Sequence, residues 1–314
     1  MENVRIESIT NRKKKGTFRL FGTSYNKEES TVGWLFCLPA VVLAIIFILL
    51  PIVISLSYAF TDANLLRLDS VHFNGIQNFV RLFHDPKVGK ALKNTFMFVV
   101  EVVPLQLCTA LGLALILNKV KRGNTFLRWA FFCPVMLSLA ITSMLWMNLL
   151  NTQDGLINTL LLAIGANPML FLDSPNQALH VIVFISAWQG AGYQMLIFLS
   201  GLKNIPKELY EAASIDRASK WSQFWNITLP SLKPTFVFIL ITMLIGAFRI
   251  CTQPMIMTQG GPLDSTLTMS YYIYIQGINY REVGYSSALA FVFTIIIASI
   301  SLTLRKVLGD ESNT

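Results

Sequence analysis

Six long apolar runs limit what this chain can fold into. A helix that crosses the roughly 30 Å hydrocarbon core of a bilayer needs about 20 mostly apolar residues. The six runs are residues 34–60, 94–118, 129–151, 178–201, 234–257 and 283–304. Only Glu101 and Arg249 are charged within them. Lipid offers no partner to an open backbone N–H or C=O group, so the sequence predicts an all-α integral membrane protein with six transmembrane helices.

The composition supports a membrane protein and argues against an enzyme. Only 13% of the 314 residues are charged, whereas about 25% is usual for a soluble protein. The four cysteines lie in apolar runs without metal-binding spacing, and they are expected to be small buried side chains. No phosphate-binding loop of the form G-x-x-x-x-G-K-[ST] occurs. We therefore expect no catalytic residues, no metal site and no cofactor bound by this chain.

Lysine and arginine set the expected orientation. The side that holds the N-terminus carries 18 of the 25 Lys and Arg residues, and the opposite side carries six. Basic loops stay in the cytoplasm, so both termini are expected there. The net charge of +8 is thus interpreted as a topology signal and not as a nucleic-acid-binding surface. Residues 1–33 would form a basic tail, which either contacts anionic lipid or is solvated, 34–308 the membrane domain and 309–314 a second tail.

Two segments on the other side have an amphipathic or aromatic pattern. Residues 75–84 place four apolar side chains on one helical face: Ile76, Phe79, Val80 and Phe83. This pattern predicts a short helix that either lies on the membrane surface or packs on the bundle. Residues 265–280 are uncharged and rich in tyrosine, which suits the headgroup boundary.

A polar stretch, residues 203–232, separates the fourth and fifth spans on the predicted cytoplasmic side. Pro206 favours the first turn of a helix that continues to Ile215. Ser219 is expected to cap a second short helix, which Pro230 would end. Three aromatic residues give this second helix an apolar side that is expected to pack under the bundle: Trp221, Phe224 and Trp225. The stretch is either a projecting helix–turn–helix or only a connector.

This stretch resembles the cytoplasmic EAA loop of ABC importer permeases, in which E-A-A-x-x-D-G-A is followed about nine residues later by I-x-L-P. The matching residues are Glu211, Ala212, Ala213, Asp216, Ala218, Ile227, Leu229 and Pro230. Arg217 stands where the family pattern has glycine, and a positive φ there would cost on the order of 1 kcal/mol. Arg217 therefore either alters the turn or contacts the partner. Residues 75–98 and 257–274 further resemble the maltose-type carbohydrate importer permeases.

The resemblance implies a set of partners. It predicts a heterodimer with a second homologous permease subunit, and two cytoplasmic ATPase subunits that bind ATP and Mg and dock on the EAA loops. It also predicts an extracellular solute-binding protein, a carbohydrate solute and a location in the bacterial cytoplasmic membrane. The ATPase-coupling residues would be Glu211, Ala212, Ala213, Asp216, Arg217, Ala218, Leu229 and Pro230. An ion-coupled secondary sugar transporter is the alternative, and a scaffold subunit without its own path is a third.

The expected solute path uses polar residues of the spans that flank this loop. Span 4 supplies Gln189, Gly190 and Tyr193, with Gly190 and Gly192 allowing close helix approach. Span 5 supplies Arg249, Thr252 and Gln253, which a continuous helix would place on one face. Glu101 either pairs with Arg249 or extends to the headgroups. Beyond span 5, Gly260, Gly261 and Pro262 are expected to form a flexible external turn that faces the binding protein.

Overall fold

The computed structural model describes residues 17–20, 23–67, 70–120 and 123–309. Contacts divide the chain after Ser57 into two units. The first contains an antiparallel hairpin of β1 (Thr17–Leu20) and β2 (Thr23–Asn26), followed by a helix built from α1 (Lys27–Ala44), η1 (Ile45–Leu49) and α2 (Leu50–Tyr58). The hairpin is an addition to the predicted all-α fold, and the tail predicted at 1–33 already contains the start of α1. Residues 1–16, which carry most of the basic tail, and the C-terminal residues 310–314 lie outside the described residues.

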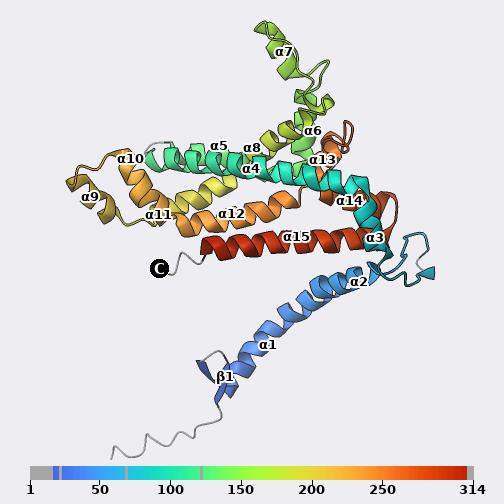
Figure 1. Cartoon of the computed structure of the whole chain (residues 1–314). Coiled ribbons are helices and arrows are strands. Elements are labelled where there is room, and N and C mark those ends of the chain that lie inside the picture. The colour runs from blue at the N-terminus through green and yellow to red at the C-terminus, as the bar shows by residue number, and fades with distance from the viewer. Residues whose placement is uncertain (1–16, 21–22, 68–69, 121–122, 310–314) are drawn as a thin grey trace, which may run out of the picture. The chain divides into compact units, whose positions relative to one another are not determined.

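The second unit is a helix bundle (Figure 1). Its elements are α3 (Gln77–His84), α4 (Pro86–Lys119), α5 (Asn124–Met136), α6 (Leu139–Leu149), α7 (Leu156–Ala163), η3 (Phe171–Asp173), α8 (Ala178–Lys203), α9 (Lys207–Ile215), α10 (Lys220–Gln223), η4 (Phe224–Thr228), α11 (Leu229–Ser231), α12 (Lys233–Phe248), α13 (Thr252–Met257), α14 (Met269–Tyr274), η5 (Ile275–Asn279) and α15 (Val283–Gly309). In Figure 1, α9 and α10 lie at one end of the bundle with the C-terminal end of α15, and α3 and α14 lie at the other. These are called the elbow end and the α3 end below.

The third predicted span is not one helix. Within the described residues, five helices are long and apolar enough to cross a membrane, and α5 and α6 pass the same test only as a pair bent by 95°. The single span predicted at 129–151 is therefore divided between two helices. Pro134 lies inside the last turn of α5, and the chain turns at Leu137 and Ser138. Gln189 of α8 donates to the freed carbonyl of Leu137 at 3.1 Å, so a side chain replaces the lost helical hydrogen bond.

The fifth predicted span is also interrupted. Helix α12 ends at Phe248 and α13 begins at Thr252, with Arg249 between them. Pro254 has no N–H to donate to the carbonyl four residues earlier, that of Ile250. That carbonyl instead accepts from the hydroxyl of Thr268 at 2.9 Å.

The core of the bundle consists of two hydrophobic clusters along its length. Helix α4 packs along α8, and both contribute to each cluster. The cluster toward the α3 end takes residues of α4 up to Val103, and the cluster toward the elbow end takes residues from Leu107 onward. The corresponding division lies between Ala187 and Ala191 in α8, and at Met243 in α12. The two clusters therefore meet near the middle of each long helix. Cys108 and Cys133 are exposed, contrary to the expectation that the cysteines are buried.

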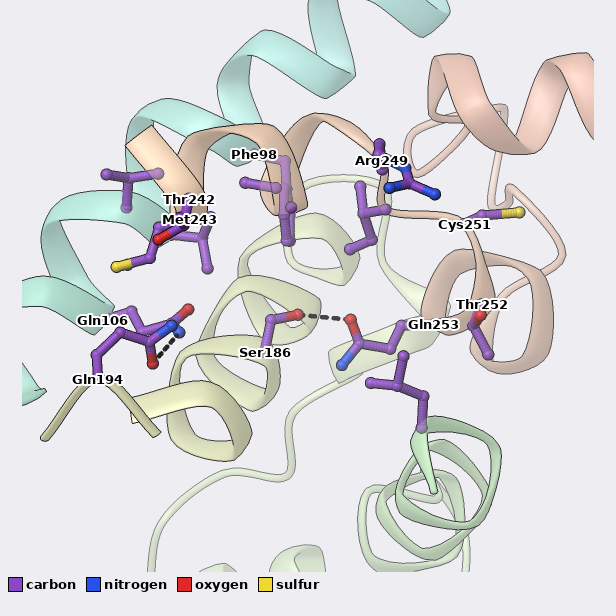
Figure 2. Close-up of a pocket in the computed structure, with 16 residues that line it drawn as sticks. Phe98, Gln106, Ser186, Gln194, Thr242, Met243, Arg249, Cys251, Thr252 and Gln253 are labelled. Carbon is purple, nitrogen blue, oxygen red and sulfur yellow. Dashed lines mark hydrogen bonds between the residues drawn. The ribbon is translucent and has the colours of Figure 1, made fainter. Parts of the chain in front are cut away.

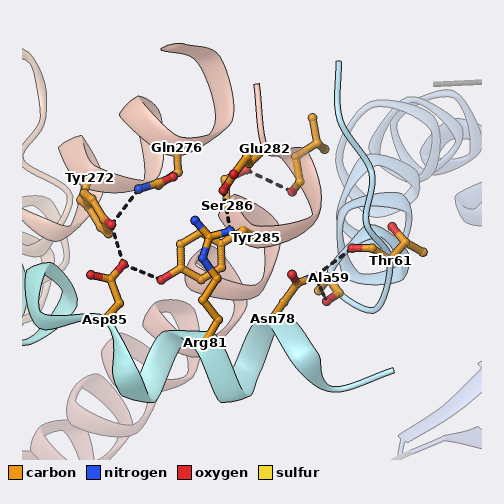
Figure 3. A network of polar contacts seen from close by, with 11 residues as sticks. Ala59, Thr61, Asn78, Arg81, Asp85, Tyr272, Gln276, Glu282, Tyr285 and Ser286 are labelled. Atoms are coloured by element: carbon orange, nitrogen blue, oxygen red, sulfur yellow. Dashed lines mark hydrogen bonds and ion pairs between the residues drawn. The ribbon is translucent and has the colours of Figure 1, made fainter. Parts of the chain in front are cut away.

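A polar network holds the α3 end together (Figure 3). Asp85 caps α4, since its carboxylate accepts from the backbone N–H of Lys87 at 2.9 Å. The same carboxylate accepts the hydroxyl groups of Tyr272 at 2.5 Å and Tyr285 at 2.7 Å. Gln276 donates to the Tyr272 hydroxyl at 2.7 Å. The network therefore joins the start of α4 to α14, η5 and α15.

Charges nearby complete this network. Arg81 lies 4.0 Å from the ring centre of Tyr285 and pairs with Glu282 at 2.7 Å. Burial opposes the ionised form of Asp85. The hydrogen bonds from the two tyrosines and from Lys87, together with the charge of Arg81, outweigh burial and lower the pKa of this carboxyl below its ordinary value.

Each of the two segments predicted for the membrane surface has some side chains packed in the bundle and others exposed. In α3, Phe79 packs on Phe60 and Phe291, with ring centres 5.2 and 6.3 Å away. The rest of the predicted face is exposed: Ile76, Val80 and Phe83. In residues 265–280, Tyr271 and Tyr272 are buried, which differs from the headgroup position expected for this segment. The hydroxyl of Tyr272 finds its partner inside the bundle at Asp85.

Candidate functional site

A polar cavity lies where the two core clusters meet. It has a volume of about 280 Å³ and is bounded by α4, α8, α12 and α13, with one residue from the start of α6 (Figure 2). Its polar lining residues are Gln106, Ser186, Gln194, Thr242, Arg249, Thr252 and Gln253. Amide, hydroxyl and guanidinium groups of this kind bind hydroxyl-rich solutes in pockets of otherwise apolar lining. Positions in the middle of long spans are typical of transport sites at the bilayer midplane.

Two hydrogen bonds order the carboxamides of this cavity. Gln106 of α4 donates to Gln194 of α8 at 3.0 Å, and Ser186 of α8 donates to Gln253 of α13 at 2.7 Å. Figure 2 shows the Gln106–Gln194 and Ser186–Gln253 contacts as separate pairs, and Arg249 lies apart from both. Gln253 is buried, so its contact with Ser186 fixes the position of α13 against α8. Each amide still has donor or acceptor capacity for a solute.

The predicted residues of span 5 line this cavity, but their predicted alignment is wrong. Arg249, Thr252 and Gln253 are all lining residues. They do not share one helical face, because α12 ends before Arg249 and α13 starts at Thr252. The helix interruption brings them to the cavity.

The predicted residues of span 4 lie elsewhere. Gln189 is buried and binds the carbonyl of Leu137 and, at 3.2 Å, the hydroxyl of Thr142, so it holds the break between α5 and α6. Gly190 faces Gln106: a Cβ there would lie 2.2 Å from its Nε2 atom. Tyr193 is 52% exposed, and it is not among the cavity's lining residues. The close approach expected at the glycines is confirmed.

Four lining residues are not among the predicted path residues: Gln106, Ser186, Gln194 and Thr242. Gln106 and Thr242 are polar residues in long apolar runs, and that isolation was the available signal. Gln194 lies five residues after Gln189, about 140° further around the helix, so a helical face through Gln194 excludes Gln189. The residue types alone do not decide between these two faces.

Glu101 pairs with His180 and not with Arg249. The Glu101 carboxylate lies 2.7 Å from Nδ1 of His180, and neither residue lines the polar cavity. The contact joins α4 to the first turn of α8. Across the part of the chain that the structure describes, Arg249 has no ion pair, hydrogen bond or ring contact through its side chain.

The predicted helix–turn–helix between α8 and α12 is present as α9 and α10. Helix α9 ends in a Schellman motif: Ala218 N–H donates to Ala213 C=O at 2.9 Å, and Arg217 N–H to Ser214 C=O at 3.2 Å. This motif needs a left-handed residue, and Arg217 has φ of 55°. Arg217 therefore takes the positive φ that was considered for this position, with the cost given above. Ser219 caps α10 by accepting from Ser222 N–H at 3.2 Å, also as expected.

Pro230 does not end the second helix. The chain forms a wider π-helical turn, η4, and continues through α11 into α12. The same arrangement precedes Pro51, where η1 ends two residues before the proline. Since proline lacks an N–H group, a widened turn before it lets the helix continue without a steric clash.

Internal contacts brace the elbow, defined here as residues 203–232. Tyr210 of α9 bonds to Thr228 of η4 at 2.9 Å between their hydroxyl oxygens. Gln223 donates to the carbonyl of Ala218 at 3.2 Å. Leu232, at the base, is fully packed into the hydrophobic cluster of the elbow end. Sequence reasoning missed Tyr210, Gln223 and Thr228, whose role depends on partners across the turn.

The outer surface of the elbow is available to another protein. Helix α9 has no buried residue, and Ile215 is 83% exposed. The aromatic side chains of the second helix were expected to pack under the bundle. They instead pack on one another, with Trp221 at 70% and Trp225 at 49% exposure.

The turn predicted to face a binding protein lies between α13 and α14 and is well held. Gly260 has φ of 85°, a conformation that favours glycine, and its carbonyl accepts from Thr266 N–H at 3.2 Å. The Thr266 hydroxyl donates to Gly261 C=O at 2.9 Å, next to Pro262. Asn94 of α4 donates to the carbonyl of Asp264 at 2.8 Å. These contacts do not fit the flexible turn that was expected.

Comparison with known proteins gives the family. A family model described as the binding-protein-dependent transport system inner membrane component matches residues 88–308. The chain is 37% identical over 285 residues to the probable ABC transporter permease protein YesP of Bacillus subtilis (strain 168), which covers 89% of this chain and 91% of that protein. It is 36% identical over 285 residues to the lactose transport system permease protein LacF of Rhizobium radiobacter, with 89% and 94% covered.

A solved structure supports the fold. One chain of a bacterial ABC transporter involved in the import of the acidic polysaccharide alginate matches with a TM-score of 0.80 and 22% identity, over 90% of this chain and 96% of that chain. The two chains therefore share the fold of a helical membrane bundle. The chain belongs to the family of inner membrane components of binding-protein-dependent transport systems. It is a permease of the ABC importer type and a multi-pass protein of the cytoplasmic membrane, in a family of membrane subunits that are not themselves enzymes.

Proposed function

We propose that this permease forms part of the translocation path for a carbohydrate or carbohydrate-like solute, which an extracellular binding protein delivers. The cavity between the core clusters is the path segment of this chain, because it is the polar cavity at mid-bundle depth and carries amide and hydroxyl groups. Relatives include permeases whose names specify lactose and arabinooligosaccharides, which supports a sugar. The path residues are Gln106, Ser186, Gln194, Arg249, Thr252 and Gln253.

The elbow is the proposed contact with the motor of the importer. One observation carries this assignment: α9 is exposed along its length while the base of the elbow is packed into the core. Two separate ATPase subunits would bind ATP and Mg, and each would hold the elbow of one permease subunit in a heterodimer. The proposed contact residues are Glu211, Ala212, Ala213, Asp216, Arg217 and Ala218, with Leu229 and Pro230 at the base.

The charge distribution on the bundle supports a cytoplasmic elbow. Basic residues at the elbow end are Lys119, Lys203, Lys207, Lys220, Lys233, Arg305 and Lys306. The C-terminal end of α15 lies at the same end in Figure 1. Since basic loops remain in the cytoplasm, this charge supports an elbow beside cytoplasmic partners and an α3 end outside. The turn at Gly260, Gly261 and Pro262 would then face the binding protein.

The elbow also has the stiffness that a lever needs. Its two limbs are joined by the Tyr210–Thr228 and Gln223–Ala218 contacts, so movement of α9 carries η4 with it. Leu232 and Ile205 pack into the elbow-end cluster, which extends to Met243 at the cavity. In the proposed cycle, ATP closes the ATPases, the elbows move as rigid bodies, and the cavity changes the side to which it opens. Hydrolysis resets the importer.

The elbow proposal is tested in the assembled importer in proteoliposomes, by measuring ATP hydrolysis and solute uptake together. Glu211→Lys and Ala213→Asp are expected to lower uptake at least tenfold while membrane insertion stays normal, since each adds an unmatched charge at a close contact. Glu208→Lys is the matched control, because it makes the same charge change on the same exposed helix outside the motif. Normal uptake with either elbow variant would contradict the proposal.

The alternative, an ion-coupled secondary transporter, makes a different prediction. Such a carrier would transport sugar as a single chain, driven by a proton or sodium gradient. Family membership favours the importer. Uptake by the purified chain alone under an ion gradient, without nucleotide, would establish the carrier instead.

A further inference from the structure

The proposed path contains one formal charge, and it is positive. Arg249 lines the cavity, and every other lining residue is neutral. The remaining polar lining groups are amides and hydroxyls, of which four are paired with one another: Gln106 with Gln194 and Ser186 with Gln253. A guanidinium group at mid-span depth is unfavourable unless it faces water or an anionic partner.

The acidic residues of the spans and of the α3 end form contacts with residues other than Arg249. Glu101, the one acidic residue within the predicted spans, pairs with His180 at 2.7 Å. At the α3 end, Asp85 binds Tyr272 and Tyr285, and Asp264 lies 3.8 Å from Lys90. Among the described residues, Arg249 has no ion pair, hydrogen bond or ring contact of its side chain.

The backbone around Arg249 exposes the side chain to the cavity. Helix α12 ends at Phe248, and the Arg249 N–H donates to Gly246 C=O at 3.1 Å in a tight final turn. Arg249 is exposed, although it lies in the chain between buried Phe248 and the start of α13. The five N–H donors of its guanidinium are therefore free to bind a planar, two-oxygen anion.

From these observations we propose that the solute carries a carboxylate, and that Arg249 binds it in the path. This inference rests on the proposed function and narrows its solute to acidic sugars, such as uronic-acid-containing oligosaccharides. The amides and hydroxyls bind the ring hydroxyl groups, and Arg249 binds the carboxylate as a bidentate pair. The solute thereby supplies the negative charge that the cavity lacks.

The test uses Cys251, a free cysteine that itself lines the cavity. In the assembled importer in nanodiscs, Cys37, Cys108 and Cys133 are replaced by serine, and the rate of Cys251 alkylation by N-ethylmaleimide is measured without nucleotide. The probes are two matched pairs of disaccharides, cellobiouronate with cellobiose and digalacturonate with digalactose. Within each pair the members differ in whether C6 carries a carboxylate or a hydroxymethyl group. Sodium acetate is the control for a carboxylate without a sugar.

At least one acidic disaccharide is expected to slow alkylation, while its neutral counterpart and acetate do not. Arg249→Gln is expected to weaken this protection about tenfold to a hundredfold in probe concentration, because a charge-assisted pair is lost. Arg249→Lys keeps the positive charge but lacks the planar pair of N–H donors. Its protection is therefore expected to lie between that of the wild type and that of Arg249→Gln. The wild-type rate without probe, compared with the rate in Arg249→Gln, verifies that Cys251 remains accessible.

Three results would overturn the proposal. Equal protection by the acidic and neutral members of both pairs would show that the cavity does not distinguish a carboxylate from a hydroxymethyl group. Undiminished protection in Arg249→Gln would place the recognition elsewhere. Protection by no probe would indicate that a carboxylate of the second permease subunit, or a lipid phosphate, occupies Arg249. Because the assay needs no ATP, it is separable from the proposed function: ATP-driven uptake of a neutral sugar with no charge discrimination overturns only this inference.

Discussion

Replacing Asp85 with asparagine is expected to loosen the α3 end while the bundle stays folded. The Asp85 carboxylate accepts hydroxyl hydrogen bonds from Tyr272 at 2.5 Å and Tyr285 at 2.7 Å, and it caps α4 through Lys87 N–H. A hydrogen bond to a charged group contributes about 1.5–3 kcal/mol and a neutral one about 0.5–1.5 kcal/mol. Loss of the charge therefore costs about 1 kcal/mol for each tyrosine. Partial exposure of the carboxyl lowers the total to about 1–2 kcal/mol.

Hydrogen exchange of the importer in nanodiscs measures this effect locally. A loss of 1–2 kcal/mol corresponds to roughly 5- to 30-fold faster exchange by local opening, expected in residues 86–92 and 271–276. Asparagine is as good a helix cap as aspartate, so Asp85→Asn isolates the tyrosine contacts, whereas Asp85→Ala also loses the cap. Tyr285→Phe should give about half the effect, and the double variant should be less than additive. Unchanged exchange in Asp85→Asn, or equal effects of Asn and Ala, would refute the reasoning.

The same carboxylate predicts a pH dependence. The pKa of Asp85 is lowered in the folded chain, so its contribution to stability is fully present above the unfolded value of about 4. That contribution is lost as the pH falls through the lower folded pKa. The difference in opening free energy between wild type and Asp85→Asn should therefore be constant from pH 5 to 7 and shrink below about pH 4. A difference that grows on acidification would contradict the assigned hydrogen bonds.

Two further predictions concern glycine positions. Arg217→Gly should relieve the left-handed strain by about 1 kcal/mol and slow hydrogen exchange of the Ala218 amide roughly fivefold. Arg217→Ala should leave this exchange rate unchanged. Equal rates in the wild type and both variants would contradict the assigned strain. Gly192→Ala should destabilise by about 1–3 kcal/mol, since its Cβ would lie 2.2 Å from the Phe131 carbonyl oxygen. Gly190→Ala meets only a flexible side chain and should cost less, and thermal aggregation of the purified importer compares the two.

The two helices of the elbow and the cap at Ser219 could be predicted because their signals are local. Ser219 acts on an amide three residues away, and the positive φ of Arg217 follows from how α9 ends. The spans could be predicted from their length and lack of charge, which depend only on the hydrocarbon thickness. The pairing of Tyr210 with Thr228 could not, because it depends on how the two limbs meet.

The helix interruptions could not be placed from the sequence. Pro104 lies within α4, which continues through it, whereas α5 ends soon after Pro134 and α12 ends before Pro254. The sequence is mostly apolar on both sides of each interruption. The difference lies in side chains distant in sequence, since Gln189 and Thr268 supply hydrogen bonds to the carbonyls that are freed. The residues chosen in span 4, Gln189, Gly190 and Tyr193, do not line the cavity although α8 is continuous, because the face that α8 turns to the cavity depends on its packing against distant helices.

The position of the cavity relative to the elbow has a mechanical consequence for the proposed cycle. Helix α12 begins at the elbow and ends at Phe248, next to Arg249, and its first half belongs to the elbow-end cluster. Close-packed segments move as units, because a packed core has few intermediate arrangements. Helices α4 and α8 run unbroken through both clusters, so a displacement of α9 would tilt them together with the elbow-end cluster and would not part the bundle into halves. The boundary between the two clusters is lined by Gln106, Gln194 and Thr242. Within this proposal, elbow motion changes the packing at this boundary, where the solute site lies.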